Sequence, residues 1–83
     1  MPSRRPQARH GGSVLQRLVA LLGETDIIVT PNTKWTDLGF DGDSLDVFVR
    51  GNVSEEFGVP LSGEDAGKTV GDLVKAINRA LGA

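Results

Sequence analysis

The sequence has no cysteine and a single histidine. Without cysteine the chain can form no disulfide, no thiolate metal site and no cysteine nucleophile. The histidine, His10, lies in a polar N-terminal stretch, so we expect no histidine-based metal site. No apolar run approaches the length that crosses a bilayer, and no signal-like cleavage pattern follows the basic residues 1–12. We therefore expect a cytoplasmic protein without a membrane partner.

The residues that are present suit one small, acidic domain. The chain has 83 residues, 39% of them apolar, which is enough for one core without cross-links. Three of its nine basic residues lie in residues 1–12, which contain no acid, so six remain against all eleven acids in residues 13–83. Such a body repels phosphates, so we expect no nucleic-acid partner and favour basic protein partners. A soluble surface alone would also account for the charge.

The N-terminal third predicts an arm, a helix and a long loop. Residues 1–12 hold prolines, glycines and arginines, which predicts a disordered basic arm ahead of a folded domain over residues 13–83. Ser13 and Gln16 fit a capping box, which predicts that the first helix begins at Ser13 and ends before Gly23. Residues 24–43 then form a long connection that Trp35 and neighbouring apolar residues pin to the core. A strand over residues 27–30 is possible but has no predicted partner.

The rest of the chain predicts two further helices and a short one. Asp43 is a suitable N-cap for a helix over residues 44–57, with Asp46 as its capping partner and Gly58 as its stop. A short helix is expected around residues 64–66, and Thr69 with Asp72 caps the last one. The fold class is all-α: a small helical bundle of three main helices plus one short helix, with a long loop between helices one and two. The predicted core is Leu15, Leu18, Leu22, Trp35, Leu38, Leu45, Phe48, Val53, Phe57, Leu73, Val74 and Ile77.

Ser44 is the residue best placed for chemistry. It stands between a glycine-containing loop and a helix, where an exposed hydroxyl and free backbone amides suit a phosphodiester. Its neighbours Asp43 and Asp46 would repel a phosphate but attract basic enzymes. Taken alone, the segment is better explained as a capped helix start than as a functional serine.

The wider pattern resembles the acyl carrier protein family over residues 13–82. The order is Asp37-Leu38-Gly39, then Asp43-Ser44-Leu45-Asp46, then residues 55–59 (EEFGV), then Thr69-Val70 at the last helix. The resemblance implies that Ser44 is the phosphopantetheine attachment site, with Asp43 beside it and Leu45 near the exit of the arm or in the core. The implied cofactor is covalent 4'-phosphopantetheine, whose thiol carries acyl chains as thioesters in fatty acid, polyketide or other specialised biosynthesis.

The resemblance also implies a protein that is not an enzyme and works as a monomer. Its partners would be a phosphopantetheinyl transferase and acyl-loading or acyl-processing enzymes such as a ketosynthase or an acyltransferase. The helix after Ser44 would be the face that they read. We therefore expect partner contacts at Asp46, Val47, Arg50, Glu55 and Glu56.

The sequence departs from the family pattern and leaves alternatives open. Residues 40–42 make the loop before Asp43 two residues longer than usual. The spacing from Ser44 to residues 55–57 is one residue shorter than usual, and an alternative register would put Asp43 in place of the serine and leave a carrier that cannot be loaded. Residues 47 and 49–51 replace part of an acidic recognition surface, which favours a specialised pathway. Two alternatives are a carrier-fold module that docks without an arm, and a peptidyl or aminoacyl carrier, although Asp43 stands where a peptidyl carrier usually has histidine.

Two other site types fail on spacing. A calcium-binding loop starting at Asp37 would place Phe48 where a bidentate glutamate is required. A serine hydrolase lacks the second glycine of the nucleophile elbow, and its only base would be His10 in the arm.

Overall fold

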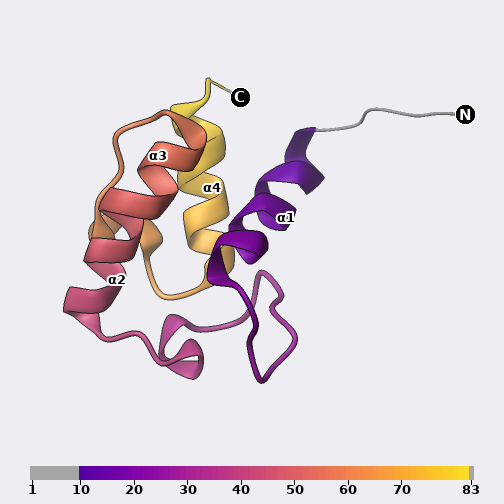
Figure 1. Ribbon diagram of the computed structural model, residues 1–83. Helices are drawn as coiled ribbons and strands as arrows, with labels where there is room; N and C mark the ends of the chain where they lie inside the picture. The colour runs from indigo at the N-terminus through magenta and orange to yellow at the C-terminus, as the bar shows by residue number, and fades with distance from the viewer. Residues whose placement is uncertain (1–9, 83) are drawn as a thin grey trace, which may run out of the picture.

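The computed structural model describes residues 10–82, which form a small all-α bundle. In the view of Figure 1, α4 lies at the back between α1 and a long helical column, and the connection from α1 loops beneath them. Helix α1 contacts both α4 and the middle of the column. The column is one continuous helix over residues 42–57, hereafter the long helix, made of three segments. In chain order the elements are α1 (His10–Leu22), η1 (Trp35–Leu38), α2 (Gly42–Phe48), η2 (Val49–Val53), α3 (Ser54–Phe57), η3 (Gly63–Ala66) and α4 (Val70–Ala80).

Helix α1 begins at His10, so the prediction of a start at Ser13 is wrong by three residues. A capping-box sequence permits a helix to start but does not prevent the backbone from continuing upstream of it. The rest of the predicted arm, residues 1–9, lies outside the described residues. The predicted end is confirmed: Gly23 has a φ of 74°, and its N–H donates to the Ala20 carbonyl at 3.2 Å.

The connection after α1 is held by hydrogen bonds to the start of α4. The Trp35 N–H donates to the Lys68 carbonyl at 3.2 Å, and the Val70 N–H donates to the Thr33 carbonyl at 2.9 Å. The Trp35 indole N–H also reaches the Ala66 carbonyl at 2.9 Å. The structure has no strand over residues 27–30. The only β-bridge within residues 10–82 joins Lys34 and Thr69, outside that segment.

The long helix begins two residues before the predicted start and takes a different cap. Asp41, not Asp43, is the N-cap residue, with extended backbone angles and a side chain that accepts from the Ser44 N–H. The predicted stop is confirmed, since Gly58 adopts the left-handed conformation at a φ of 68°. Asp43 therefore lies in the first turn rather than at its edge.

The middle of the long helix is a π-helix over Val49–Val53. Of the five buried residues of the long helix, Leu45, Val49, Val53 and Phe57 recur every four positions, and Phe48 is the fifth. In a regular α-helix that spacing drifts by about 40° per step, so the wider π turn brings the stripe back toward the core. Ser54 secures the turn, because its hydroxyl donates to the Val49 carbonyl and accepts from the Leu61 N–H, both at 3.0 Å.

The core forms where the three helices meet, and most of the predicted core is buried there. Leu15, Leu22, Leu38 and Val74 are only half-buried and pack against it. Five further residues outside that predicted list are also buried: Val14, Val49, Leu61, Ala66 and Val70. Val49 is fully buried, so its assignment to a partner-facing surface is wrong.

The last two predicted elements are confirmed. The short helix is the 3-10 turn η3, and α4 is capped by Thr69 with Asp72 as its capping-box partner. The Thr69 hydroxyl accepts from the Asp72 N–H at 3.2 Å, and the Asp72 carboxylate accepts from the Thr69 N–H at 3.1 Å. Among residues 10–82, no helix has the length and hydropathy that crossing a membrane requires.

Candidate functional site

Ser44 lies in the first turn of α2, with its side chain exposed. Its backbone N–H donates to the Asp41 carboxylate at 2.8 Å, while its hydroxyl oxygen accepts from the Asp41 N–H at 3.0 Å. The hydroxyl hydrogen faces the Asp41 carbonyl, 3.3 Å from Ser44 Oγ. The serine is thus at once a surface hydroxyl and half of a capping box.

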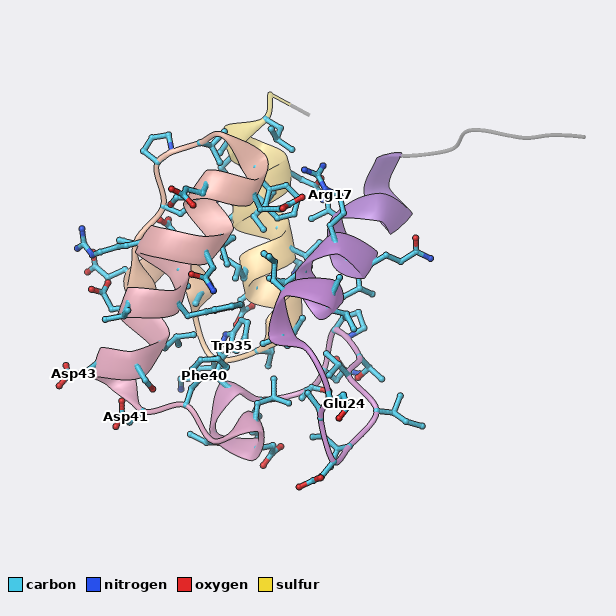
Figure 2. The ribbon with its side chains drawn as sticks, viewed as in Figure 1. Arg17, Glu24, Trp35, Phe40, Asp41 and Asp43 are labelled. Carbon is cyan, nitrogen blue, oxygen red and sulfur yellow. The ribbon has the colours of Figure 1, made fainter. Side chains whose placement is uncertain are left out.

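Asp41 and Asp43 flank this hydroxyl with negative charge. Figure 2 shows both carboxylates pointing away from the bundle at the start of α2. The hydrogen bond from the Ser44 backbone N–H, followed by that involving the Ser44 side chain, holds the pKa of Asp41 below its usual value. Asp41 therefore stays ionised at neutral pH, and a basic protein surface would be attracted to this end of the helix.

Leu45 anchors the site from below. The Leu45 side chain is buried against the core, whereas the two preceding residues, Asp43 and Ser44, are exposed. The sequence thus placed all three proposed attachment residues at one helix start, although it did not identify Asp41 as the cap. The signal for Asp41 was its position three residues before Ser44, but serine is an uncommon capping-box partner, and Asp43 matched an N-cap equally well.

The five residues predicted to contact partners fall into two groups. Asp46, Arg50 and Glu56 form ion pairs within the chain, whereas Val47 and Glu55 are exposed residues for which no such pair is found in the described chain, Val47 being 70% exposed. Asp46 accepts from the Gly63 N–H at 2.7 Å and pairs with Arg50 at 2.8 Å. The Gly63 bond is the larger cause that lowers the pKa of Asp46, so this carboxylate ties η3 to the long helix.

Glu56 holds α1 against the long helix. Its carboxylate pairs with Arg17 at 2.9 Å, and the same guanidinium donates to the Glu56 carbonyl at 2.9 Å. The Arg17 guanidinium carbon also stands 4.4 Å from the centre of the Phe57 ring, close enough for a cation–π contact. The sequence gave no sign of this link, because the two residues are 39 positions apart.

A cavity of about 400 Å³ opens beside the attachment turn. Trp35, Phe40 and Leu45 supply its apolar wall, and Lys34 and Lys68 line it from two adjacent segments. Figure 2 shows Trp35 and Phe40 close together at the base of the bundle, and their rings meet edge to face at 5.6 Å. The turn that carries Ser44 therefore borders a space large enough for part of a flexible chain.

Metal chemistry finds no support among the described residues. No group of three or more His, Asp or Glu side chains within residues 10–82 is arranged to hold an ion. Two of the acidic residues considered for a calcium-binding loop belong to helices: Asp41 caps the long helix, and Asp37 lies in η1.

No protein-family model matches this sequence, and no solved structure matches its fold. The interpretation of the site accordingly rests on the motif around Ser44 and on its geometry.

Proposed function

We propose that this chain is a discrete acyl carrier protein with phosphopantetheine attached to Ser44 Oγ. The observation that carries the proposal is the exposed hydroxyl within Asp43-Ser44-Leu45, at the first turn of a helix in a small all-α bundle. The chain would be a non-catalytic carrier, modified and used by other enzymes.

The loading reaction is a phosphoryl transfer to Ser44. Its Oγ would attack the β-phosphorus of coenzyme A, the bond to the adenosine bisphosphate would break, and the serine proton would pass to a base on the transferase. The transferase would supply the magnesium. The chain itself contributes a backbone fixed by buried Leu45 and an acidic surface at Asp41 and Asp43.

Loading would disturb the capping box. The Oγ hydrogen that faces the Asp41 carbonyl is lost when the phosphodiester forms, and a new negative charge arises beside Asp41 and Asp43. The Asp41 N–H can still donate to the esterified oxygen, although ester oxygens are weaker acceptors than hydroxyls. The arm would therefore extend away from the two carboxylates.

The function further proposed is delivery of acyl thioesters in fatty acid, polyketide or another specialised pathway in the cytoplasm. Partners would be a phosphopantetheinyl transferase and enzymes such as a ketosynthase or an acyltransferase, meeting a monomeric carrier. Of the predicted contact residues, Val47, Arg50 and Glu55 are the more accessible to them. A peptidyl or aminoacyl carrier is the same proposal with a different cargo.

One observation favours a second candidate, a docking module without an arm. Both hydrogen-bonding roles of the Ser44 hydroxyl are used within the capping box. A serine kept only for capping would have this geometry. Modification of Ser44 separates the two candidates.

The test is the intact mass after incubation with coenzyme A, magnesium and a broad-specificity phosphopantetheinyl transferase. We expect the wild type to gain one phosphopantetheine and Ser44→Ala to gain none. Asp43→Asn, which keeps the serine and its helix, serves as the matched control and should still be loaded. The double variant Asp43→Ser, Ser44→Ala tests the shifted register, and we expect it to remain unloaded.

Two results would contradict the proposal. A folded wild type that gains no mass, beside a control carrier that does, would favour the docking module. Loading of Ser44→Ala would place the modification on another residue.

A further inference from the structure

We propose that a cavity at the end of α1 is a docking socket for a basic segment of a partner protein that inserts an apolar side chain. The socket has a volume of about 470 Å³. It lies between the C-terminal end of α1, the loop that follows, η1 and the middle of the long helix. Its lining residues are Leu21, Leu22, Glu24, Thr25, Asp26, Ile27, Asp37, Leu38, Gly39, Phe40, Phe48 and Asn52.

The floor of the socket is apolar. It is formed by core-facing side chains that the bundle leaves partly uncovered, namely Leu21, Leu22, Leu38 and Phe40, together with the edge of buried Phe48. The Phe40 and Phe48 rings lie 5.2 Å apart and tilted, so they form a continuous aromatic surface. A side chain the size of phenylalanine or leucine entering here would bury apolar area on both partners.

The lip of the socket is also apolar and exposed. Ile27, which lines the socket, is 42% exposed. The next residue, Ile28, does not line the socket but is 88% exposed, the highest value among the large apolar residues of the described chain. The Thr25 hydroxyl donates to the Ile27 carbonyl at 2.6 Å, which fixes the turn that presents them. An exposed apolar lip beside an apolar hollow is typical of a surface that another protein covers.

The rim carries only negative charge. Glu24, Asp26 and Asp37 line the socket, and among residues 10–82 no lysine, arginine or histidine does. Figure 2 shows Glu24 on the loop beneath α1, with Phe40 lying between it and Asp41 in that view. The two ion pairs formed among the described residues, Arg17–Glu56 and Arg50–Asp46, involve none of these three acids. The charge that complements this rim is therefore positive and must come from the occupant.

The chain itself offers a poor occupant. Residues 1–9 contain Arg4, Arg5 and Arg9, but their only large apolar side chain is Met1. The occupant that fits both floor and rim is a partner segment in which a phenylalanine or leucine stands between lysines or arginines. A cavity of this size accepts one or two side chains, so the contact would be small and transient.

The socket is separate from the proposed attachment site. Phe40 contributes to both cavities, but Ser44 and its capping partner Asp41 do not line the socket. A partner could dock here while Ser44 stays accessible. The inference does not depend on Ser44 carrying an arm, so it can fail or hold independently of the proposed function.

The experiment is an NMR titration of the full chain, uniformly labelled with ¹⁵N, with synthetic peptides. The probe is an acetylated, amidated heptapeptide Gly-Lys-Arg-Phe-Arg-Lys-Gly. One control peptide replaces phenylalanine with alanine, and the other replaces every lysine and arginine with glutamine. We expect saturable shifts confined to residues 21–27, 37–40 and 48–52 with the probe, and none with either control.

Two charge-matched variants test the rim. Glu24→Gln, Asp26→Asn, Asp37→Asn removes the three rim charges and should weaken binding of the probe about tenfold. Asp43→Asn, Glu55→Gln, Glu64→Gln removes three exposed charges elsewhere and should change it less than twofold. The spectrum of each free variant shows directly whether its fold is retained.

Three outcomes would overturn the proposal. Equal weakening by the two triple variants, or equal binding of the alanine peptide, would show attraction to acidic surface without a socket. Concentration-dependent shifts at the socket without peptide would show a second copy of the chain as its occupant. Shifts at the socket when Arg4, Arg5 and Arg9 are replaced by glutamine, again without peptide, would show the chain's own N-terminal residues there.

Discussion

A single hydroxyl at the start of the long helix has two possible uses. Ser44 completes the capping box of Asp41 and is also the residue proposed for attachment. These uses are compatible only if the helix start tolerates losing part of the cap. The stability of the helix start should therefore depend more on Asp41 than on Asp43.

Replacing the N-cap residue Asp41 should lower the thermal stability of the protein more than replacing Asp43. Asp41→Ala removes the acceptor of the Ser44 N–H, so we expect the thermal midpoint to fall by several degrees. Asp43→Ala, two positions inside the helix, should shift it much less. Thermal unfolding followed by circular dichroism measures both, and a larger loss for the Asp43 variant would restore the cap that the sequence predicted.

The sequence predicted which residues gather at this turn but not how they bond. Asp43, Ser44 and Leu45 follow from a motif, and the motif survives a shift of the helix start by two residues. The choice between Asp41 and Asp43 depends on which backbone is extended, and both carry the same side chain. The same limit applies to Asp46 and Glu56, whose partners Gly63 and Arg17 are distant in sequence.

The π segment of the long helix is a feature that the sequence pattern did not indicate. The apolar positions of the long helix recur every four residues, which a helical pattern accommodates without indicating any change of pitch. With this spacing the apolar stripe would rotate away from the core in a regular α-helix, and the wider π turn corrects that rotation. Gly51 lies within the π segment. The position of Gly51 inside the helix was predictable, and so was the apolar face that Val49 and Val53 share, but the wider turn was not, because the same spacing also fits a regular α-helix.

Two glycines, one inside the long helix and one directly after it, should respond to substitution by alanine in opposite directions. A Cβ at Gly51 meets nothing within 4 Å and the residue is exposed, so Gly51→Ala should stabilise by about 0.5–1 kcal/mol. A Cβ at Gly58 has equal space, but its φ of +68° is strained for alanine, so Gly58→Ala should destabilise by about 1–2 kcal/mol. Urea unfolding measures each.

The pair controls for the chemical change, since both variants add one methyl group to an open surface. Destabilisation by Gly51→Ala would mean that the π turn needs glycine for reasons other than space. Stabilisation by Gly58→Ala would mean that the helix does not end in the left-handed conformation.

The whole molecule is held by carboxylates as well as by its core. Asp41 caps the long helix, Asp46 joins it to η3, and Asp72 caps α4 and accepts from the Lys68 N–H at 2.9 Å. Hydrogen bonds lower the pKa of each below the ordinary value of 3.8, with the Lys68 and Thr69 N–H groups the main cause at Asp72. Each of these hydrogen bonds is stronger to the ionised carboxylate than to the protonated acid.

Stability should therefore fall in acid. A carboxylate whose pKa is lower in the folded than in the unfolded chain stabilises the fold at every pH above the unfolded value. That contribution is lost as the pH drops from about 4 through the lowered pKa values. Urea midpoints measured from pH 7 to pH 2.5 should decline only in the acid range, and the decline should be shallower in Asp41→Asn, Asp46→Asn, Asp72→Asn. An equally steep decline in the triple variant would assign the acid sensitivity to other groups.

For the whole molecule, the sequence predicted most of the helices and their caps, but not the backbone hydrogen bonds between distant segments. The all-α bundle, the α4 cap and the short turn before it all follow from local patterns of period and capping. The bonds that fasten the long connection to α4, such as Gly71 N–H to the Pro31 carbonyl at 2.8 Å, join backbone atoms and leave no trace in the side-chain pattern. The two cavities that Phe40 lines are formed by segments distant in the sequence, so they too could not be predicted.

The packing of Trp35 gives the protein a built-in optical reporter. It is the only tryptophan in the chain and there is no tyrosine, so emission excited at the indole band comes from one known position. Its ring lines the cavity beside the attachment turn and touches Phe40, which also lines the socket. An arm folding back into the first space would change the polarity around the indole directly, whereas a peptide entering the second would reach it only through Phe40. Emission wavelength and quenching can therefore distinguish the two events in an unlabelled chain.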